Sequence, residues 1–349
     1  MKNKQKTINC IVYILSVLSL ISCSKSHESA ESKIKIDLSH FENTMNYSEF
    51  VDSISYIQLE TNDSCLISEI EYLSVANNEI FIKDLKSGGI FRFDNHGTFL
   101  SKLNKYGSGP GEFNRISSFD IDPIQRIIYI YDDKQKNILS YTFEGKYIST
   151  IRVLDIVKDF ALLDNREFMF ICPNYCQQEH QGVWYANQEG KFKKSIIEAT
   201  TDNSFFVRSS ELCCKMFHSV LYYDKYSDKV YSINKDSARC LYSFDLKQKM
   251  PLELLKNSNA KLGDYFSNIN ICPTNKYMLL FYISDHDNRI VLFNRNDLSL
   301  IIAKKIVDDL DNSKSPYIIG RFNDSSIVAT IQLKNDLLNP RLQILHLKK

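Results

Sequence analysis

The feature that most constrains the fold is a turn that recurs at a nearly constant spacing. Polar turns follow apolar segments at Gly97, Gly145, Gly190 and Asp236, and these positions lie 48, 45 and 46 residues apart. Each interval holds short segments in which apolar and polar residues alternate, as they do in half-buried β-strands. A period of about 40–50 residues with four strands is typical of one blade of a β-propeller.

Six such units can be placed along the chain. They fall at about residues 67–104, 116–153, 156–197, 205–246, 265–306 and 317–347. The next turn, at Asp297, comes after a longer step of 61 residues. The surplus lies in residues 247–263, where Pro251 followed by apolar residues predicts a short helix inserted between blades.

The sixth unit contains only three convincing strands. The segment Ile54–Leu59 near the N-terminus alternates as a strand does and can supply the fourth. Such pairing would close the ring without leaving an open ladder between the first and last blades. The sequence therefore predicts an all-β fold: a six-bladed propeller of four-stranded antiparallel blades, with the ring closed by an N-terminal strand.

The first residues have the pattern of an export signal. Three lysines precede the short apolar run Ile11–Leu20, which is too short to span a bilayer comfortably. The following Leu20-Ile21-Ser22-Cys23 resembles the lipobox of bacterial lipoproteins, which implies cleavage before Cys23 and acylation of that residue. An ordinary signal peptide with an incidental cysteine is the alternative. We expect a signal peptide at 1–22, a lipidated cysteine and tether at 23–45, and one propeller domain at 46–349.

Charge excludes one class of partner. The chain has 43 Lys and Arg against 42 Asp and Glu, a formal net charge of +1. This balance provides no basic field to attract nucleic acid. The 21 Phe and 20 Tyr residues indicate a packed globular domain.

Several segments together resemble one family. They are Phe50–Thr61, Leu66–Ile70, Phe93-Asp94 with Gly97, and Gly107–Glu112. They are similar to six-bladed β-propeller lipoproteins of Gram-negative gut-type bacteria, which are relatives of the NHL-repeat propellers. The resemblance implies a link with outer-membrane nutrient uptake. Ser24 is not the aspartate of an inner-membrane retention signal, and no acidic run follows Cys23 directly, so we expect an outer-membrane lipoprotein on the periplasmic face in preference to the cell surface.

The expected ligand site is the central channel, which the innermost strand of each blade lines. Polar residues interrupt the apolar pattern of these strands at Glu69, Ser118, Asp120, Lys158, Asp159, Asn268, Asn270 and Arg321. Polar groups that converge from different blades suit a small-molecule or metal site. The alternative is that they only hydrate the channel.

Two functions fit this arrangement. The first is a lipid-anchored binding module for a glycan, peptide or partner protein. The second is a metal-dependent hydrolase or lyase with calcium or zinc in the channel, because some of these residues resemble the acid-and-amide ring of gluconolactonase-like propellers. The channel residues alone do not choose between them.

Other motifs carry weaker signals. Cys172 and Cys176 with His180 are conceivable zinc ligands, but an exported protein also permits a disulfide there. Gly107–Glu112 lacks the Gly-Lys-Ser/Thr ending of a phosphate loop, so its glycines are expected to allow positive φ between blades. Asp285-His286-Asp287 is expected to be a hairpin turn.

Side-chain alternation gives one further expectation. Phe91 and Phe93 should share one face of a strand in the first blade, and Arg92 should take the other. We expect the two phenylalanines to anchor the contact between blades. We expect Arg92 to reach the solvated rim, so that replacing it would change stability little.

Overall fold

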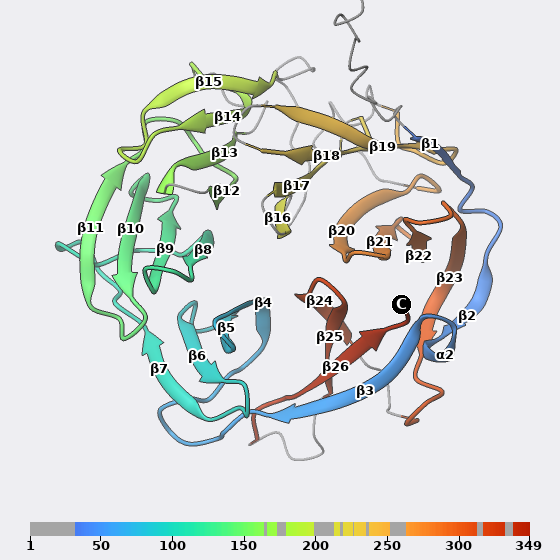
Figure 1. Cartoon of the computed structure of the whole chain (residues 1–349), viewed down its shortest axis with the longest axis horizontal. Coiled ribbons are helices and arrows are strands. Elements are labelled where there is room, and N and C mark those ends of the chain that lie inside the picture. The colour runs from blue at the N-terminus through green and yellow to red at the C-terminus, as the bar shows by residue number, and fades with distance from the viewer. Residues whose placement is uncertain are drawn as a thin grey trace, which may run out of the picture. The chain divides into compact units, whose positions relative to one another are not determined.

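The computed structural model describes residues 32–163, 166–172, 179–198, 213–216, 219–225, 227–234, 237–251, 263–312, 317–331 and 338–349. The chain divides into two compact units, Met1–Ser32 and Lys33–Lys349. The second unit is a ring of six β-sheets around a central axis, as Figure 1 shows. The predicted insertion helix after Pro251 and the predicted lipidation site Cys23 lie outside the described residues.

Four of the sheets contain four strands, and the sheets of blades four and five contain a fifth. In the first three blades the strands run from the channel to the rim in chain order. Blade one comprises β4 (Ile70–Ala76), β5 (Glu79–Asp84), β6 (Ile90–Asp94) and β7 (Phe99–Leu103). Blade two comprises β8 (Ser118–Asp122), β9 (Ile127–Asp132), β10 (Asn137–Thr142) and β11 (Tyr147–Arg152). Blade three comprises β12 (Asp159–Leu162), β13 (Phe168–Cys172), β14 (Gly182–Ala186) and β15 (Phe192–Ile197).

The other three blades each receive an additional strand from the N-terminal segment. Blade four comprises β16 (Cys213–Met216), β17 (Ser219–Asp224), β18 (Lys229–Ile233) and β19 (Ala238–Leu246). Blade five comprises β20 (Ser267–Pro273), β21 (Tyr277–Ile283), β22 (Asn288–Asn294) and β23 (Leu300–Val307). Blade six supplies only β24 (Tyr317–Asn323), β25 (Ser326–Ile331) and β26 (Arg341–Leu347) from its own part of the chain. The six predicted units match these sheets.

Ring closure is made by β3 (Val51–Gln58), which pairs antiparallel with β26 as the fourth strand of blade six. Leu342 lies opposite Ile57, and Ile344 lies opposite Ser55. The predicted fold and the predicted role of the segment around Ile54–Leu59 are confirmed. One sheet therefore joins residues near both ends of the propeller.

Two strands precede β3 in the segment that the sequence assigned to the tether. β1 (Ser32–Ile36) lies beside β19, and β2 (Glu42–Asn46) pairs parallel with β23. Between them Arg289 stacks on Phe41, 3.7 Å from the ring centroid, and its Nε donates to the Leu38 carbonyl at 2.9 Å. A short helix, α2 (Tyr47–Phe50), then leads into β3. The segment thus holds blades four, five and six together along the rim.

The apolar core lies between blades, since both faces of each sheet pack on a neighbour. Phe91 and Phe93 are fully buried in the core shared by blades one and six, together with Val328, Leu342 and Ile344. They are the contacts between blades that side-chain alternation predicted. Figure 1 shows β6 inside blade one, between β5 and β7.

The expectation for Arg92 was wrong. Its side chain is buried, with the residue only 8% exposed, and its Nε donates to the Glu79 carboxylate at 2.7 Å. A second guanidinium nitrogen donates to the Phe143 carbonyl at 2.8 Å, which belongs to blade two. The alternation rule does place Arg92 on the opposite face from Phe93. In a propeller, however, that face meets the next blade and not solvent.

The glycine-rich connector between blades one and two has a steric explanation. Gly111 has a φ of 72°, and a Cβ at this position would lie 2.6 Å from the Tyr147 ring. The Gly109 N–H donates to the Glu112 carboxylate at 2.9 Å, which fixes the loop. The connector therefore acts as a compact crossing between blades, as expected.

The burial of Phe93 and Arg92 leads to a prediction that differs from the one made by alternation alone. Phe93→Ala should lower the free energy of unfolding by about 3–5 kcal/mol through lost transfer energy and a cavity. Arg92→Ala should cost about 1–3 kcal/mol, because it removes charged donors from buried acceptors. Chemical denaturation measures both. Arg115→Ala, at a half-exposed side chain, is the control and should stay within about 0.5 kcal/mol.

Candidate functional site

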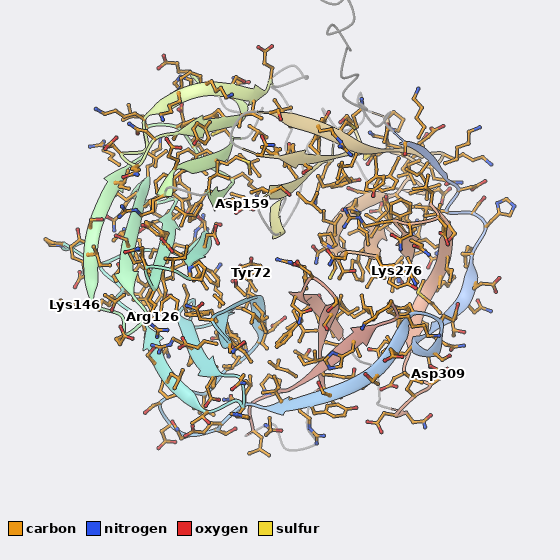
Figure 2. The ribbon with its side chains drawn as sticks, viewed as in Figure 1. Tyr72, Arg126, Lys146, Asp159, Lys276 and Asp309 are labelled. Atoms are coloured by element: carbon orange, nitrogen blue, oxygen red, sulfur yellow. The ribbon has the colours of Figure 1, made fainter. Side chains whose placement is uncertain are left out.

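The innermost strands enclose a cavity of about 710 Å³. Its wall comes from β4, β8, β12, β20 and β24, the inner strands of five blades, and from turns that follow some of them. Figure 2 places Tyr72 and Asp159 at the inner edge of the ring, whereas Lys146 and Asp309 lie at its outer edge. A cavity of this volume suits a small molecule.

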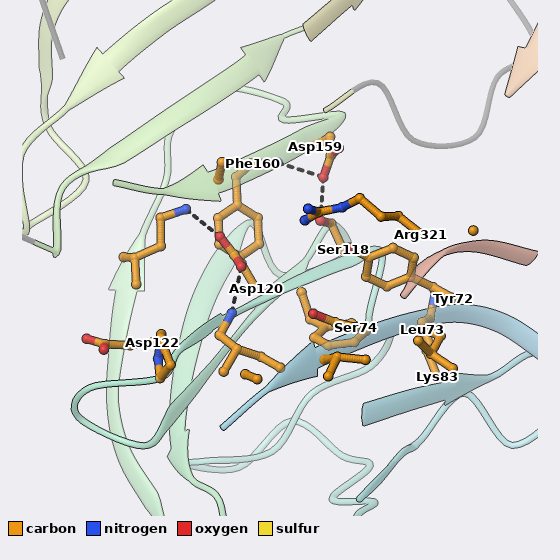
Figure 3. Close-up of a pocket in the computed structure, with 18 of the residues that line it drawn as sticks. Tyr72, Leu73, Ser74, Lys83, Ser118, Asp120, Asp122, Asp159, Phe160 and Arg321 are labelled. Carbon is orange, nitrogen blue, oxygen red and sulfur yellow. Dashed lines mark hydrogen bonds between the residues drawn. The ribbon is translucent and has the colours of Figure 1, made fainter. Parts of the chain in front are cut away.

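Three of the predicted polar residues form reciprocal contacts between blades two and three. The Ser118 hydroxyl of β8 donates to the Asp159 carboxylate of β12 at 2.5 Å. In the opposite direction, the Asp120 carboxylate of β8 accepts the backbone N–H of Leu162 at 2.7 Å. Figure 3 shows both carboxylates in the wall of the pocket with these bonds drawn. We call Ser118, Asp120 and Asp159 the inner clasp.

The inner clasp provides hydrogen-bond acceptors for backbone N–H groups that have no partner within the sheet. An innermost strand has a ladder partner on one side only, so its other N–H groups face the channel. Asp159 also accepts the Phe160 N–H at 2.8 Å, and Asp120 accepts the Ile121 N–H at 2.7 Å. Buried backbone donors need such partners. Asp120 and Asp159 therefore stabilise the inner strands of the ring by accepting these backbone hydrogen bonds.

Other polar groups of the wall remain directed at the cavity. The Asn270 side chain lines it and makes no side-chain hydrogen bond to another described residue. Figure 3 shows Arg321 reaching into the pocket near Tyr72, and the guanidinium also pairs with Asp324 in the following turn. The aromatic rings of Tyr72 and Phe119 meet edge to face at 5.1 Å between centroids. The cavity thus offers an amide, a cation and an aromatic surface.

The predicted residues do not all meet. Ser118, Asp120, Asp159, Asn270 and Arg321 line the cavity. Glu69 lies just before β4 and is exposed, outside the lining. Asn268 is 4% exposed and sits opposite Tyr282 in the β20–β21 ladder, buried inside the sheet.

Sequence reasoning missed Glu71, Lys83 and Tyr72. Lys83 Nζ lies 2.8 Å from the Glu71 carboxylate, and both residues belong to the wall. Strand alternation could have identified Tyr72 and Glu71 only with knowledge of the register shift between Ile70 and Tyr72 in β4. The sequence carries no signal for that bulge.

The proposed zinc ligands have other partners. Cys172 is buried, and its Sγ accepts the Trp184 indole N–H at 3.0 Å. His180 Nδ1 lies 2.9 Å from the Asp155 carboxylate, and its ring stacks on Phe192. Cys176 lies outside the described residues. Within the described part of the chain, no group of three or more His, Cys, Asp or Glu is arranged to hold a metal.

The hairpin expected at Asp285-His286-Asp287 is present, since the Ser284 N–H donates to the Asp287 carbonyl at 2.8 Å. The Asp287 carboxylate pairs with Arg289 at 2.8 Å and with Lys304 at 3.0 Å. Hydrogen bonding to Arg289 lowers the pKa of Asp287 to about 2. This acid is a structural partner of the arginine that holds the N-terminal segment.

Lys225, which follows β17, is a buried cation that the sequence did not indicate. Its Nζ is inaccessible to solvent and has no hydrogen-bond partner among the residues that the structure describes. Burial lowers the pKa of Lys225 to about 7, and the charge of Lys158 lowers it further. Lys158, one of the expected channel residues, immediately precedes β12.

The clasp leads to a stability prediction. Asp159→Ala should lower the free energy of unfolding by about 1–3 kcal/mol, because it leaves the Phe160 N–H and the Ser118 hydroxyl without their acceptor. In a double-mutant cycle, Ser118→Ala should cost much less in the Asp159→Ala background than in the native chain. Asp63→Ala, at an exposed carboxylate, is the control. Additive effects of the two substitutions would contradict the clasp.

The pKa of Lys225 leads to a prediction on pH. Its folded pKa, about 7, lies below the unfolded value of roughly 10.4. Between these pH values the unfolded chain binds more protons, so stability should rise with pH. The rise is roughly 1.4 kcal/mol for each pKa unit of depression. Urea denaturation at several pH values should show a flatter profile between pH 7 and 10 for Lys225→Met.

Comparison with known proteins supports the fold. A Bacteroides fragilis protein that is named as exported has a solved structure with a TM-score of 0.77 and 17% identity, covering 91% of this chain and all of that one. A member of the DUF4221 family from Bacteroides vulgatus gives a TM-score of 0.48 at 8% identity, covering 85% and 97%. Virginiamycin B lyase from Staphylococcus aureus gives 0.46 at 12% identity, covering 80% and 81%. Only the first of these likenesses supports the fold, and at 17% identity it concerns the fold alone.

A search of curated proteins finds no match. A family defined from sequence matches residues 33–339, which is nearly the whole ring. The match begins within β1 and therefore includes the N-terminal strands along the rim. The chain belongs to the family described as Domain of unknown function (DUF4934).

Proposed function

We propose that this protein is an extracytoplasmic, lipid-anchored propeller that binds a small polar ligand in its central cavity. The observation that carries the proposal is the cavity of about 710 Å³, into which five blades direct side chains. Pockets of this kind combine apolar walls with a few placed polar groups. A role as an accessory to outer-membrane nutrient uptake is the physiological context we propose.

The groups turned to the cavity suit a ligand with both polar atoms and an apolar face. Arg321 and Asn270 supply donors, and Asn270 also supplies an acceptor. Tyr72, whose ring packs against the buried Phe119, offers an aromatic surface for a sugar ring or a peptide side chain. A glycan fragment or a short peptide has both features.

The second candidate, a metal-dependent hydrolase or lyase, has less support. Its carboxylates would be Asp120 and Asp159, which already accept backbone N–H groups and the Ser118 hydroxyl. With calcium bound, these acids would have to serve the ion and their present donors together, and calcium prefers six to eight oxygen ligands. The inner clasp therefore favours binding over metal chemistry.

The envelope location rests on the sequence before Ser32. The apolar run Ile11–Leu20 and the cysteine at position 23 fit a lipoprotein signal. Within the described residues no helix is long and apolar enough to cross a membrane. The Bacteroides fragilis protein of similar fold is named as exported. We propose an outer-membrane lipoprotein on its periplasmic face.

One preparation tests both parts of the proposal. Full-length protein is purified in detergent from its native host and examined by native mass spectrometry. We expect a non-covalent small-molecule adduct that is lost in Arg321→Ala and kept in Arg115→Ala, whose side chain lies outside the cavity. Peptide mass analysis should show an acylated Cys23 as the first residue.

The outcomes separate the alternatives. Stoichiometric calcium or zinc that disappears in an Asp120→Ala, Asn270→Ala double variant would support the enzyme. An adduct that survives Arg321→Ala would place the ligand outside the cavity. An unmodified Cys23 or a retained Met1 would contradict the lipid anchor and leave the cavity result standing.

A further inference from the structure

Charge is distributed unevenly around the outer rim of the ring. β15, the rim strand of blade three, contains two lysines and no acid, and another lysine directly precedes it. β1, which lies outside blade four, also contains two lysines and no acid. Figure 1 shows β15, β19 and β1 in succession along one side of the rim. The lysines on this side are all exposed: Lys33, Lys35, Lys191, Lys193 and Lys194.

The opposite side of the ring is acidic. Figure 1 shows β3, the rim strand of blade six, across the ring from β15. Residues 47–60, which include α2 and β3, contain no lysine or arginine. The Ser48 N–H donates to the Asp309 carboxylate at 2.9 Å, and the Tyr56 hydroxyl donates to Asp311, so both acids belong to this side. The acids exposed here are Glu49, Asp52, Glu60, Asp309 and Asp311.

Most of the basic side is available for a further partner. Lys193 is already used, since its Nζ lies 2.5 Å from the Glu167 carboxylate. Lys33, Lys35 and Lys191 form no side-chain hydrogen bond or ion pair within the described part of the chain.

An exposed aromatic ring lies among these lysines. Phe192 follows Lys191 directly and is 41% exposed, although one face of its ring stacks on His180. Lysines beside an exposed phenylalanine are typical of surfaces that lie in the headgroup region of a membrane. We call Lys33, Lys35, Lys191, Lys194 and Phe192 the basic rim.

The lipid anchor proposed at Cys23 would join the ring on this same side. Ser32, the first residue of β1, is nine residues after Cys23. A chain of that length spans at most about 30 Å, so β1 stays within this distance of the acylated residue. Tethering at short range raises the effective concentration of the domain at the membrane, so a weak attraction suffices to orient it. Membrane charge acts over only about 10 Å at moderate ionic strength, which favours the side of the ring nearest the tether.

We propose that the basic rim rests on an anionic phospholipid surface and that the ring stands on its edge there. This inference rests on the lipid anchor of the proposed function. Anionic headgroups attract lysines close to the surface, and an acyl anchor together with a basic patch binds a membrane durably. The acidic side then points away from the lipid. The ring axis lies along the membrane, so neither face of the ring is pressed against the lipid and the central cavity stays accessible.

The test is acetylation footprinting of lysines in the mature protein, purified from its native host. The protein is reconstituted in vesicles of phosphatidylcholine, or of phosphatidylcholine and phosphatidylglycerol in equal amounts, and the products are measured by peptide mass spectrometry. We expect Lys33, Lys35 and Lys191 to react at least about fivefold more slowly on the anionic vesicles. Lys146 of blade two and Lys348, which donates to the Ser48 carbonyl on the acidic side, should react equally on both. Sodium chloride at about 1 M should abolish the protection by shortening the Debye length to about 3 Å.

A matched pair of variants tests the role of the basic rim. Lys191→Glu combined with Lys194→Glu should return the reaction rates of Lys33 and Lys35 to their values on neutral vesicles. Lys134→Glu combined with Lys146→Glu makes the same change in net charge on blade two and should leave the protection intact. All four replaced side chains are exposed, so both variants should keep the melting temperature of the native chain.

The outcomes separate this inference from the anchor. Acylated protein that floats with the vesicles, but whose Lys33, Lys35 and Lys191 react equally on both kinds, would overturn the inference and leave the lipid anchor standing. Equal protection of Lys348 and Lys33 would also overturn it, because the ring would then have no preferred side. Protein with an unmodified Cys23 that does not float would overturn the anchor and the inference together.

Discussion

The pairing of β3 with β26 is the constraint on which the rest of the structure depends. Six twisted sheets pack face to face around an axis, and the last gap closes only if blade six obtains a fourth strand. That strand comes from the other end of the domain, so closure links contacts nearly three hundred residues apart, such as Tyr47 with Gln343. Long-range pairing of this kind is entropically costly to form, and it makes the ring cooperative once formed. Because β1 and β2 precede β3, they are drawn along the rim and cover blades four and five.

Closure of the ring creates both the cavity and the need for the inner clasp. Each blade places one strand at the axis, and that strand has a ladder partner only on its outer side. The N–H groups of Phe160 and Leu162 must then be satisfied from the channel, which is what Asp159 and Asp120 do. The residues that make the channel polar are thus partly a consequence of the fold. Asn270 and Arg321 also line the cavity, and they are the groups that we propose for contact with a ligand.

The sequence predicted the architecture because the blade period is a local signal repeated many times. Turns such as those at Gly97 and Gly145 can be recognised without knowing how the blades pack. The last unit lacks a fourth strand of its own, which indicates that a strand from elsewhere closes the ring. The site was less predictable because the face on which a side chain lies depends on the strand register, and a β-bulge interrupts the alternation of faces. A register shift between Asn268 and Asn270 puts one amide in the sheet interior and the other in the cavity wall. Another, between Ile70 and Tyr72, brings Glu71 and Tyr72 into the wall while Glu69 stays outside it.

Arg92 shows a limit of alternation that belongs to propellers as a class. In a sheet with one wet face, alternate residues separate into core and solvent. Here the second face of blade one meets blade two, so a charged residue on it must find partners inside the protein. Arg92 does so through Glu79 and the Phe143 carbonyl, and Arg126 shares the same glutamate at 3.2 Å. A polar residue within a propeller strand should therefore be tested first for contacts that join two blades. Polar residues that make no such contact are the better candidates for binding a ligand.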